Sequence, residues 1–192
     1  TGVTAGMYMS MFDNPLFYDL KKLLAGGHLG RVSAVHCRGA YRSGLTMKPS
    51  TWRGSRRQTG GGSFIQLAIH PINMAQWLLD ERIIRVAAFS NNLMCPNVGG
   101  DDVTSAACEF KSGIQGTLSS GYAAAPNLLA IYGTKGYVSV TDENRLDILL
   151  DEAYTGETIH YEQPGKLETI QYEFNVDTLC REPNPYDQIG RA

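Results

Sequence analysis

The second half of the chain alternates short apolar segments with turn signals, and this pattern limits the possible folds more than any other feature. The turn signals lie at 99–100, 111–113, 125–127, 133–136 and 142–144. Between them the residues are mostly Val, Ile, Leu, Phe and Tyr, which favour extended backbone. We therefore expect a run of antiparallel strands.

Two helices are predicted before these strands. Asn14 and Pro15 supply a capping side chain and a proline for the first helical position, and Gly26–Gly27 end the helix. The apolar stripe of this helix consists of Leu16, Leu20, Leu23 and Leu24. A second helix is expected over about 63–79, where apolar residues cover nearly every side, so that it should be mostly buried.

A strand is expected over 31–40, followed by a long loop over 41–62, a kind of segment that is often functional. Two early helices and many later strands predict an α+β domain. Its open, mainly antiparallel sheet would carry the helices on one face. The other face would be solvated or paired with a partner.

Composition and charge exclude several classes of protein. With 192 residues, of which 43% are hydrophobic and 19% charged, the chain fits a single domain with a substantial core. The 17 basic and 19 acidic residues are scattered, which argues against a nucleic-acid partner. The chain has neither a stretch of roughly 20 apolar residues nor a signal peptide at its first residue, so we expect no membrane contact and a cytoplasmic location.

The cysteines and histidines do not suggest a metal site. The four cysteines lie far apart and are expected to be buried thiols. No two histidines lie three or four residues apart, as a zinc site on one helix would require. Near the end of the chain, Asn184–Pro185 would start a helix that has room for only a few residues. We therefore expect that the sequence is truncated at its C-terminus.

Gln66, His70 and Asn73 follow one another at spacings of four and three, which predicts a polar line on one face of the second helix. Buried polar groups need partners, so the line is expected to face a polar cleft or a structural network. Gly60–Gly62 would let another molecule approach and would leave the helix N-terminus open. Pro71 would free the carbonyl of Leu67 and kink the helix, and such a carbonyl beside His70 would hold one tautomer for acid–base chemistry.

The run from Gly60 to Asn73, followed by Trp77-Leu78-Leu79, resembles the signature helix of the glucose-fructose oxidoreductase/inositol dehydrogenase/MocA family. Further segments resemble the family in order and spacing, and together they cover most of residues 5–187. These segments are Phe12–Pro15, Leu29–Val32, Trp52–Arg53 and Ile131–Gly136.

Members of this family join an N-terminal Rossmann domain, which binds NAD or NADP, to a C-terminal domain that supplies the substrate site and usually the oligomer interface. The chain has no G-x-G-x-x-G spacing, so the resemblance implies that the Rossmann domain and its catalytic lysine are absent from it. We expect a single C-terminal substrate and oligomerisation domain over 1–192, truncated at both ends. The resemblance also implies a homo-oligomer, a dimer or tetramer formed through the open face of the sheet.

The resemblance assigns His70 the role of the catalytic histidine, which exchanges a proton with the substrate hydroxyl while hydride passes to or from the nicotinamide. Trp52 and Arg53 match a motif that touches the cofactor; without the resemblance, core packing and a surface salt bridge would be the simpler interpretations. Gln66 departs from the aspartate usual in the family. Our hypothesis is that Gln66 orients His70 or binds substrate.

Other candidates are less strongly marked. Asn73 and Tyr122 are candidate substrate contacts, although a packed aromatic is an equally good interpretation of Tyr122. Asp101 and Asp102 follow two glycines and most simply open a strand, in a loop that could also reach the cleft. Met9-Ser10-Met11 stands where relatives often carry arginine, so a polar contact made there in other members would be absent.

The sequence thus predicts the substrate-binding, catalytic-histidine domain of an NAD(P)-dependent oxidoreductase that acts on a sugar or polyol, inactive by itself. The first alternative is a non-catalytic oligomerisation or ligand-binding module with the same fold. The second is an isomerase or hydrolase that uses His70 alone, for which no nucleophile or paired carboxylate has a recognisable spacing.

Overall fold

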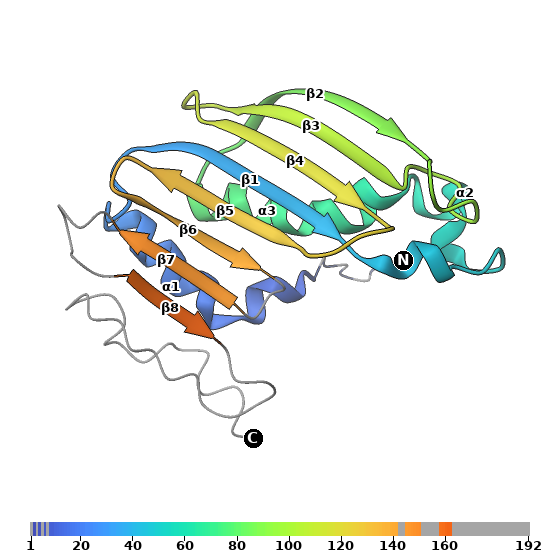
Figure 1. Ribbon diagram of the computed structural model, residues 1–192, viewed down its shortest axis with the longest axis horizontal. Coiled ribbons are helices and arrows are strands. Elements are labelled where there is room, and N and C mark those ends of the chain that lie inside the picture. The colour runs from blue at the N-terminus through green and yellow to red at the C-terminus, as the bar shows by residue number, and fades with distance from the viewer. Residues whose placement is uncertain are drawn as a thin grey trace, which may run out of the picture.

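The computed structural model describes residues 2, 4, 6, 8–141, 145–150 and 158–162. Their main feature is one eight-stranded sheet in the order β2-β3-β4-β1-β5-β6-β7-β8 (Figure 1). The strands are β1 (Val32–Ala40), β2 (Ile83–Asn91), β3 (Val103–Phe110), β4 (Gln115–Gly121), β5 (Leu128–Gly133), β6 (Gly136–Thr141), β7 (Arg145–Leu150) and β8 (Thr158–Glu162).

All neighbouring strands in this sheet are antiparallel except β1 and β4, which run parallel at its centre. The predicted open, mainly antiparallel sheet is therefore confirmed. The predicted turns at 99–100, 111–113, 125–127 and 133–136 connect strands as expected. The turn at 142–144 and the helix start at Asn184–Pro185 lie outside the described residues.

Two helices, α1 (Pro15–Ala25) and α3 (Ile69–Leu79), cover one face of the sheet (Figure 1). A 3-10 turn, η1 (Ser10–Asp13), precedes α1. The start of α1 is as predicted, because the Asn14 side chain accepts a hydrogen bond from the amide of Leu16 and Pro15 occupies the first turn.

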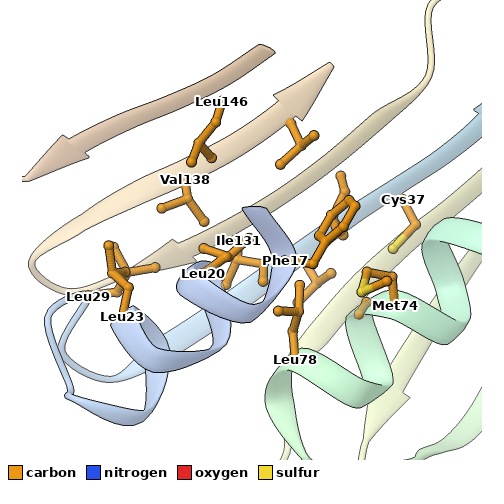
Figure 2. Close-up of a cluster of buried hydrophobic side chains, with 14 of the residues drawn as sticks. Phe17, Leu20, Leu23, Leu29, Cys37, Met74, Leu78, Ile131, Val138 and Leu146 are labelled. Carbon is orange, nitrogen blue, oxygen red and sulfur yellow. The ribbon is translucent and has the colours of Figure 1, made fainter. Parts of the chain in front are cut away.

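The main core lies between the two helices and the sheet. Figure 2 shows Leu20 and Leu23 of α1 facing Ile131, Val138 and Leu146 of successive strands. Alternate residues of each strand supply this core, since neighbouring side chains of a strand point to opposite faces. Burying one such side chain contributes about 1.5–3 kcal/mol, so this interface accounts for much of the stability of the domain.

The second predicted helix is split into two parts. Its first part, η4 (Phe64–Ala68), is a π-helical turn, and α3 continues from it. Pro71 falls in the first turn of α3, where a missing amide is tolerated. Burial is also less complete than predicted, because Ile65 and Ile69 are 48% and 44% exposed.

The segment expected to be a long loop contains three short helical turns, η2 (Arg42–Thr46), η3 (Trp52–Gly54) and α2 (Arg56–Thr59). It packs on a second, small hydrophobic cluster that consists of Met47, Cys95, Val98 and Tyr122. The local order of the segment therefore comes from contacts with residues distant in sequence, which periodicity does not reveal.

The opposite face of the sheet carries no helix in the part of the chain that the structure describes (Figure 1). His36, Tyr132 and Tyr137 form a ring cluster there, with ring centroids 5.0 and 5.7 Å apart. Cys37, Cys95 and Cys108 are free and buried, as predicted, and Cys180 lies outside the described residues. No described helix is long and apolar enough to cross a membrane.

Candidate functional site

The candidate site lies where β1 and β4 end. Because these strands are parallel, both lead to the same end of the sheet, where α2 also lies (Figure 1). Gly39 in β1 packs directly on the π turn, since a Cβ atom there would stand 2.5 Å from the Ala68 nitrogen and the Leu67 oxygen. This close contact seats the start of α3, and with it His70, against the end of β1.

His70 lines a recess of about 40 Å³, enough for a water-sized group. The helix contributes Leu67 and Pro71 to its wall, and the ends of the strands contribute Arg38, Tyr41 and Asn127. The rest of the lining is apolar and consists of Met11, Phe17, Leu128, Leu129 and Val140. A histidine in a small, largely apolar recess has the setting that acid–base chemistry requires.

The two ring nitrogens of His70 are in different environments. Nδ1 is buried and has no hydrogen-bond partner among the described residues, whereas Nε2 is not among the buried atoms that lack a partner. The expectation that the carbonyl of Leu67 would hold the ring is therefore wrong: this carbonyl packs against Gly39 and leaves Nδ1 unbonded.

Gln66 does not orient His70 by a direct hydrogen bond, which corrects that part of the hypothesis. Its Nε2 donates to the carbonyl oxygens of Arg53 and Gly61, at 3.0 and 3.1 Å. Its Oε1 accepts from the Tyr122 hydroxyl at 2.8 Å. The carboxamide is thus occupied by protein partners on both sides.

The predicted polar line is not a continuous line of contacts. Asn73 donates to the sulfur of Met9 at 3.1 Å, away from the partners of Gln66. The π turn explains the divergence, because its wider turn changes the angle about the helix axis between Gln66 and the α-helical residues that follow. Asn73 thus contacts the N-terminal segment in the very region where the sequence departs from the family.

Tyr122 is a packed aromatic in this structure, one of the two interpretations that the sequence left open. It is only 1% exposed and lies in the small cluster with Met47 and Cys95. Burial, Asp101 and Cys95 raise the pKa of its phenol against the lowering effect of Arg53. Tyr122 therefore reaches the site only through its hydrogen bond to Gln66.

Trp52 and Arg53 project from the protein. Trp52 is 54% exposed, and the Arg53 guanidinium stacks over its ring at 4.6 Å. Core packing does not apply to Trp52, because its ring is exposed. A salt bridge does not apply to Arg53, because the ion pair found among the described residues joins Arg85 to Glu109. An exposed aromatic face beside a free cation suits a ligand with an aromatic ring and phosphate groups.

Gly60–Gly62 serve internal packing more than the approach of another molecule. Gly62 lies directly against the backbone of Asp101, and a Cβ atom there would clash with it. The helix N-terminus is closed, because the Asp101 carboxylate accepts from the amides of Gly62 and Phe64 and from the Ser63 hydroxyl. Gly60 and Gly61 line a polar groove of about 420 Å³ beside Arg56.

Asp101 and Asp102 directly precede β3, as the simpler interpretation predicted, and their carboxylates hold the neighbouring loops. Burial works to raise the pKa of the Asp101 carboxyl, but hydrogen bonds from Phe64, Ser63, Gly62 and Thr104 bring it below its usual value. The same balance lowers the pKa of Asp102, whose carboxylate accepts from the amides of residues 93–95. Both carboxylates are thus committed to structure.

Sequence reasoning missed Arg38, Tyr41 and Asn127, which share the recess with His70. Asn127 also accepts a hydrogen bond from the amide of Ala40, which fixes the exit of β1. Their common signal is position, since each lies at or near a strand end. Recognising it requires knowing that β1 lies beside β5, which no local pattern shows.

Comparison with known proteins places the chain among oxidoreductase domains. The family model described as the GFO/IDH/MocA C-terminal domain matches residues 17–139. The myo-inositol dehydrogenase Hyg17 of Streptomyces leeuwenhoekii is 28% identical over 111 residues, which are 56% of this chain and 32% of that protein. The inositol 2-dehydrogenase of Rhizobium meliloti (strain 1021) is 26% identical over 155 residues, 77% of this chain and 45% of that protein.

A solved structure shares the fold. The NAD binding oxidoreductase from Klebsiella pneumoniae superposes with a TM-score of 0.70 at 21% identity, covering 80% of this chain and 44% of that one. The chain spans less than half the length of each of these three proteins.

Proposed function

The chain belongs to the GFO/IDH/MocA family, because the model of that family's C-terminal domain matches residues 17–139. On this premise we propose that the chain forms the substrate side of an NAD(P)-dependent oxidoreductase. The substrate class we propose is a sugar or polyol, oxidised at a hydroxyl or reduced at a carbonyl. The observation that carries the proposal is His70, which lines a small recess with one ring nitrogen buried. The names of two relatives, both inositol dehydrogenases, support the substrate class.

In the proposed reaction His70 exchanges a proton with the substrate oxygen through Nε2. In the oxidation direction the neutral ring, in the tautomer that carries its proton on Nδ1, accepts the hydroxyl proton at Nε2 and becomes an imidazolium. In the reduction direction the imidazolium returns the proton from Nε2 to the carbonyl oxygen and becomes neutral again. Nδ1 is buried without a partner among the described residues, so Nε2 is the nitrogen that we propose to face the substrate.

Trp52 and Arg53 are the residues of this chain that we propose to hold the cofactor. The exposed indole face suits the nicotinamide or another flat ring, and the guanidinium suits a phosphate oxygen. When bound, the cofactor supplies the hydride acceptor or donor. The remainder of the cofactor site would belong to a dinucleotide-binding domain elsewhere in the protein.

The uncovered face of the sheet is the surface that we propose for homo-oligomer formation, as a dimer or tetramer. Its ring cluster of His36, Tyr132 and Tyr137 gives it the aromatic character that interface centres favour. The same observation favours the second candidate function, a module whose role is assembly without catalysis.

Replacing His70 distinguishes these functions. In the full-length protein with a polyol substrate and NAD or NADP, we expect His70→Ala to lower kcat by about 10²–10⁴-fold, the usual contribution of a positioned acid or base. His28→Ala, in a Gly-rich turn remote from the recess, is the matched control and should retain parental turnover. Equal turnover in parent and His70→Ala would refute the catalytic role, and a parent without turnover that still assembles would favour the module.

A further inference from the structure

Gln66 ties the exposed Trp52–Gly54 turn to the helix that carries His70. We infer that Gln66 is a positioning residue for this turn, which sets the place of Trp52 and Arg53 for the cofactor, and that it does not act on His70. The inference rests on the proposed function, because it assigns the turn to the cofactor. It gives Gln66 a role different from substrate binding or orientation of the histidine.

The hydrogen bonds of Gln66 all lead toward the turn and its support. The amide group donates to the carbonyl of Arg53 within η3 and to the carbonyl of Gly61 at the start of the π turn. The amide oxygen accepts from Tyr122, which is anchored in the small cluster. One side chain therefore joins the turn, the start of its own helix and the distant Tyr122.

The Trp52–Gly54 turn packs at Gly54 against Asn97, but it has few other hydrogen bonds. Apart from hydrogen bonds to its neighbours in sequence, the described residues give it one further tether, from the amide of Gly99 to the carbonyl of Gly54 at 2.7 Å. The side chains of Trp52 and Arg53 point outward and stack on each other. The backbone carbonyl of Arg53 is thus the point at which the Gln66 side chain holds the pair.

The chemistry at this point requires a carboxamide. Two carbonyl oxygens face Nε2, so the group there must donate, while the Tyr122 hydroxyl needs an acceptor on the other side. A carboxylate of the same shape would keep the bond from Tyr122 and turn an acceptor toward both carbonyls. Gln66→Glu therefore breaks the hydrogen bonds to Arg53 and Gly61 and keeps the one from Tyr122, whereas Tyr122→Phe removes only the bond from the supporting side.

The test measures cofactor affinity and turnover in the full-length protein. We expect Gln66→Glu to weaken NADH or NADPH binding, followed by cofactor fluorescence, by at least about tenfold, because two carbonyls lose their donor. Tyr122→Phe should weaken it by about fivefold, the equivalent of one ordinary hydrogen bond. In both variants kcat at saturating cofactor and the pH profile of kcat should match the parent.

Gln115→Glu is the matched control. It makes the same change in an exposed turn, where the Gln115 amide donates to the carbonyl of Gly113, and cofactor affinity should not change. Amide hydrogen exchange of residues 52–62 should accelerate in Gln66→Glu alone. Unchanged affinity in that variant, or an altered pH profile of kcat, would overturn the inference, whereas a parent that binds neither cofactor would instead refute the proposed function.

Discussion

At the scale of single residues, Asp101 organises the site more than the predicted residues do. Its carboxylate accepts hydrogen bonds from Gly62, Ser63, Phe64 and Thr104 and so closes the N-terminus of the helix that carries His70. A carboxylate at a helix N-terminus also interacts favourably with the helix dipole. The position of His70 thus depends on the Asp101 side chain, which lies just before β3.

The stability contribution of Asp101 should depend on pH. Its pKa is lowered in the folded protein, so the contribution is present above the ordinary carboxyl pKa of 3.8 and is lost as pH falls through the folded value. At pH 7 we expect Asp101→Asn to lower the free energy of unfolding by about 2 kcal/mol, since donors lose a charged acceptor. Urea unfolding at pH 7 and near pH 3 measures the effect.

The difference between the variant and the parent should become smaller at the acidic pH, because the contribution of the charged carboxylate falls as pH drops below its ordinary pKa. Asp13→Asn is the matched control, since the Asp13 side chain is exposed. A difference between Asp101→Asn and the parent that is the same at both pH values would show that charge is not the cause.

At the scale of secondary structure, the contact between the π turn and β1 sets the distance between the helix that carries His70 and the sheet. It depends on Gly39, which leaves no room for a side chain. π turns occur often at functional sites, where they change the direction of the residues that follow. Here the turn separates the direction of Gln66 from that of His70.

Gly39→Ala should therefore destabilise the domain, because the added methyl group would press on the backbone of Leu67 and Ala68. We expect a loss of about 1–3 kcal/mol in the free energy of unfolding, typical of overpacking. Gly6→Ala, where a Cβ atom meets nothing, should change it little. Thermal or urea unfolding checks the prediction, and equal stability of both variants would contradict it.

Local sequence signals predicted the elements well where neighbours in sequence determine them. Asn14–Pro15 start α1 because capping is local, and the turns appear where glycine and proline permit them. The π turn has no such signal. The packing role of Gly62 has no local signal either, since Asp101, against which it packs, lies 39 positions further along the chain.

Burial of the site residues was equally hard to predict. Tyr122 and Trp52 are both aromatic residues, yet one is buried and the other is half-exposed. The difference arises from the small cluster, which gathers residues from the loop, from the segment after β2 and from the end of β4. Amino-acid type alone contains no information on such an assembly.

At the scale of the whole molecule, the two faces of the sheet are unlike. One face is covered by α1 and α3, and the other presents His36, Tyr132 and Tyr137 at its surface (Figure 1). Thr117 of β4 lies beside His36 in the register of the parallel pair and is exposed. A charge at this position would stand near the centre of the proposed oligomer interface.

We expect Thr117→Glu to convert the oligomer of the full-length protein to smaller species, because a charge without a partner is costly to bury in an interface. Light scattering coupled to size exclusion measures the mass. Lys22→Glu, which changes charge on the exposed side of α1, should leave the mass unchanged. An unaltered mass for Thr117→Glu would remove this face from the interface.

The parallel pairing of β1 with β4 also has a consequence for synthesis on the ribosome. β1 forms early in the chain, yet Ala34 pairs with Gln115 and Val32 pairs with Gly133. At about 5–20 residues per second, the first strand waits several seconds with both edges open until its neighbours emerge. The centre of the sheet therefore closes only after β4 and β5 have emerged, and α3, which packs on β1 and is made before them, is the cover that β1 has meanwhile.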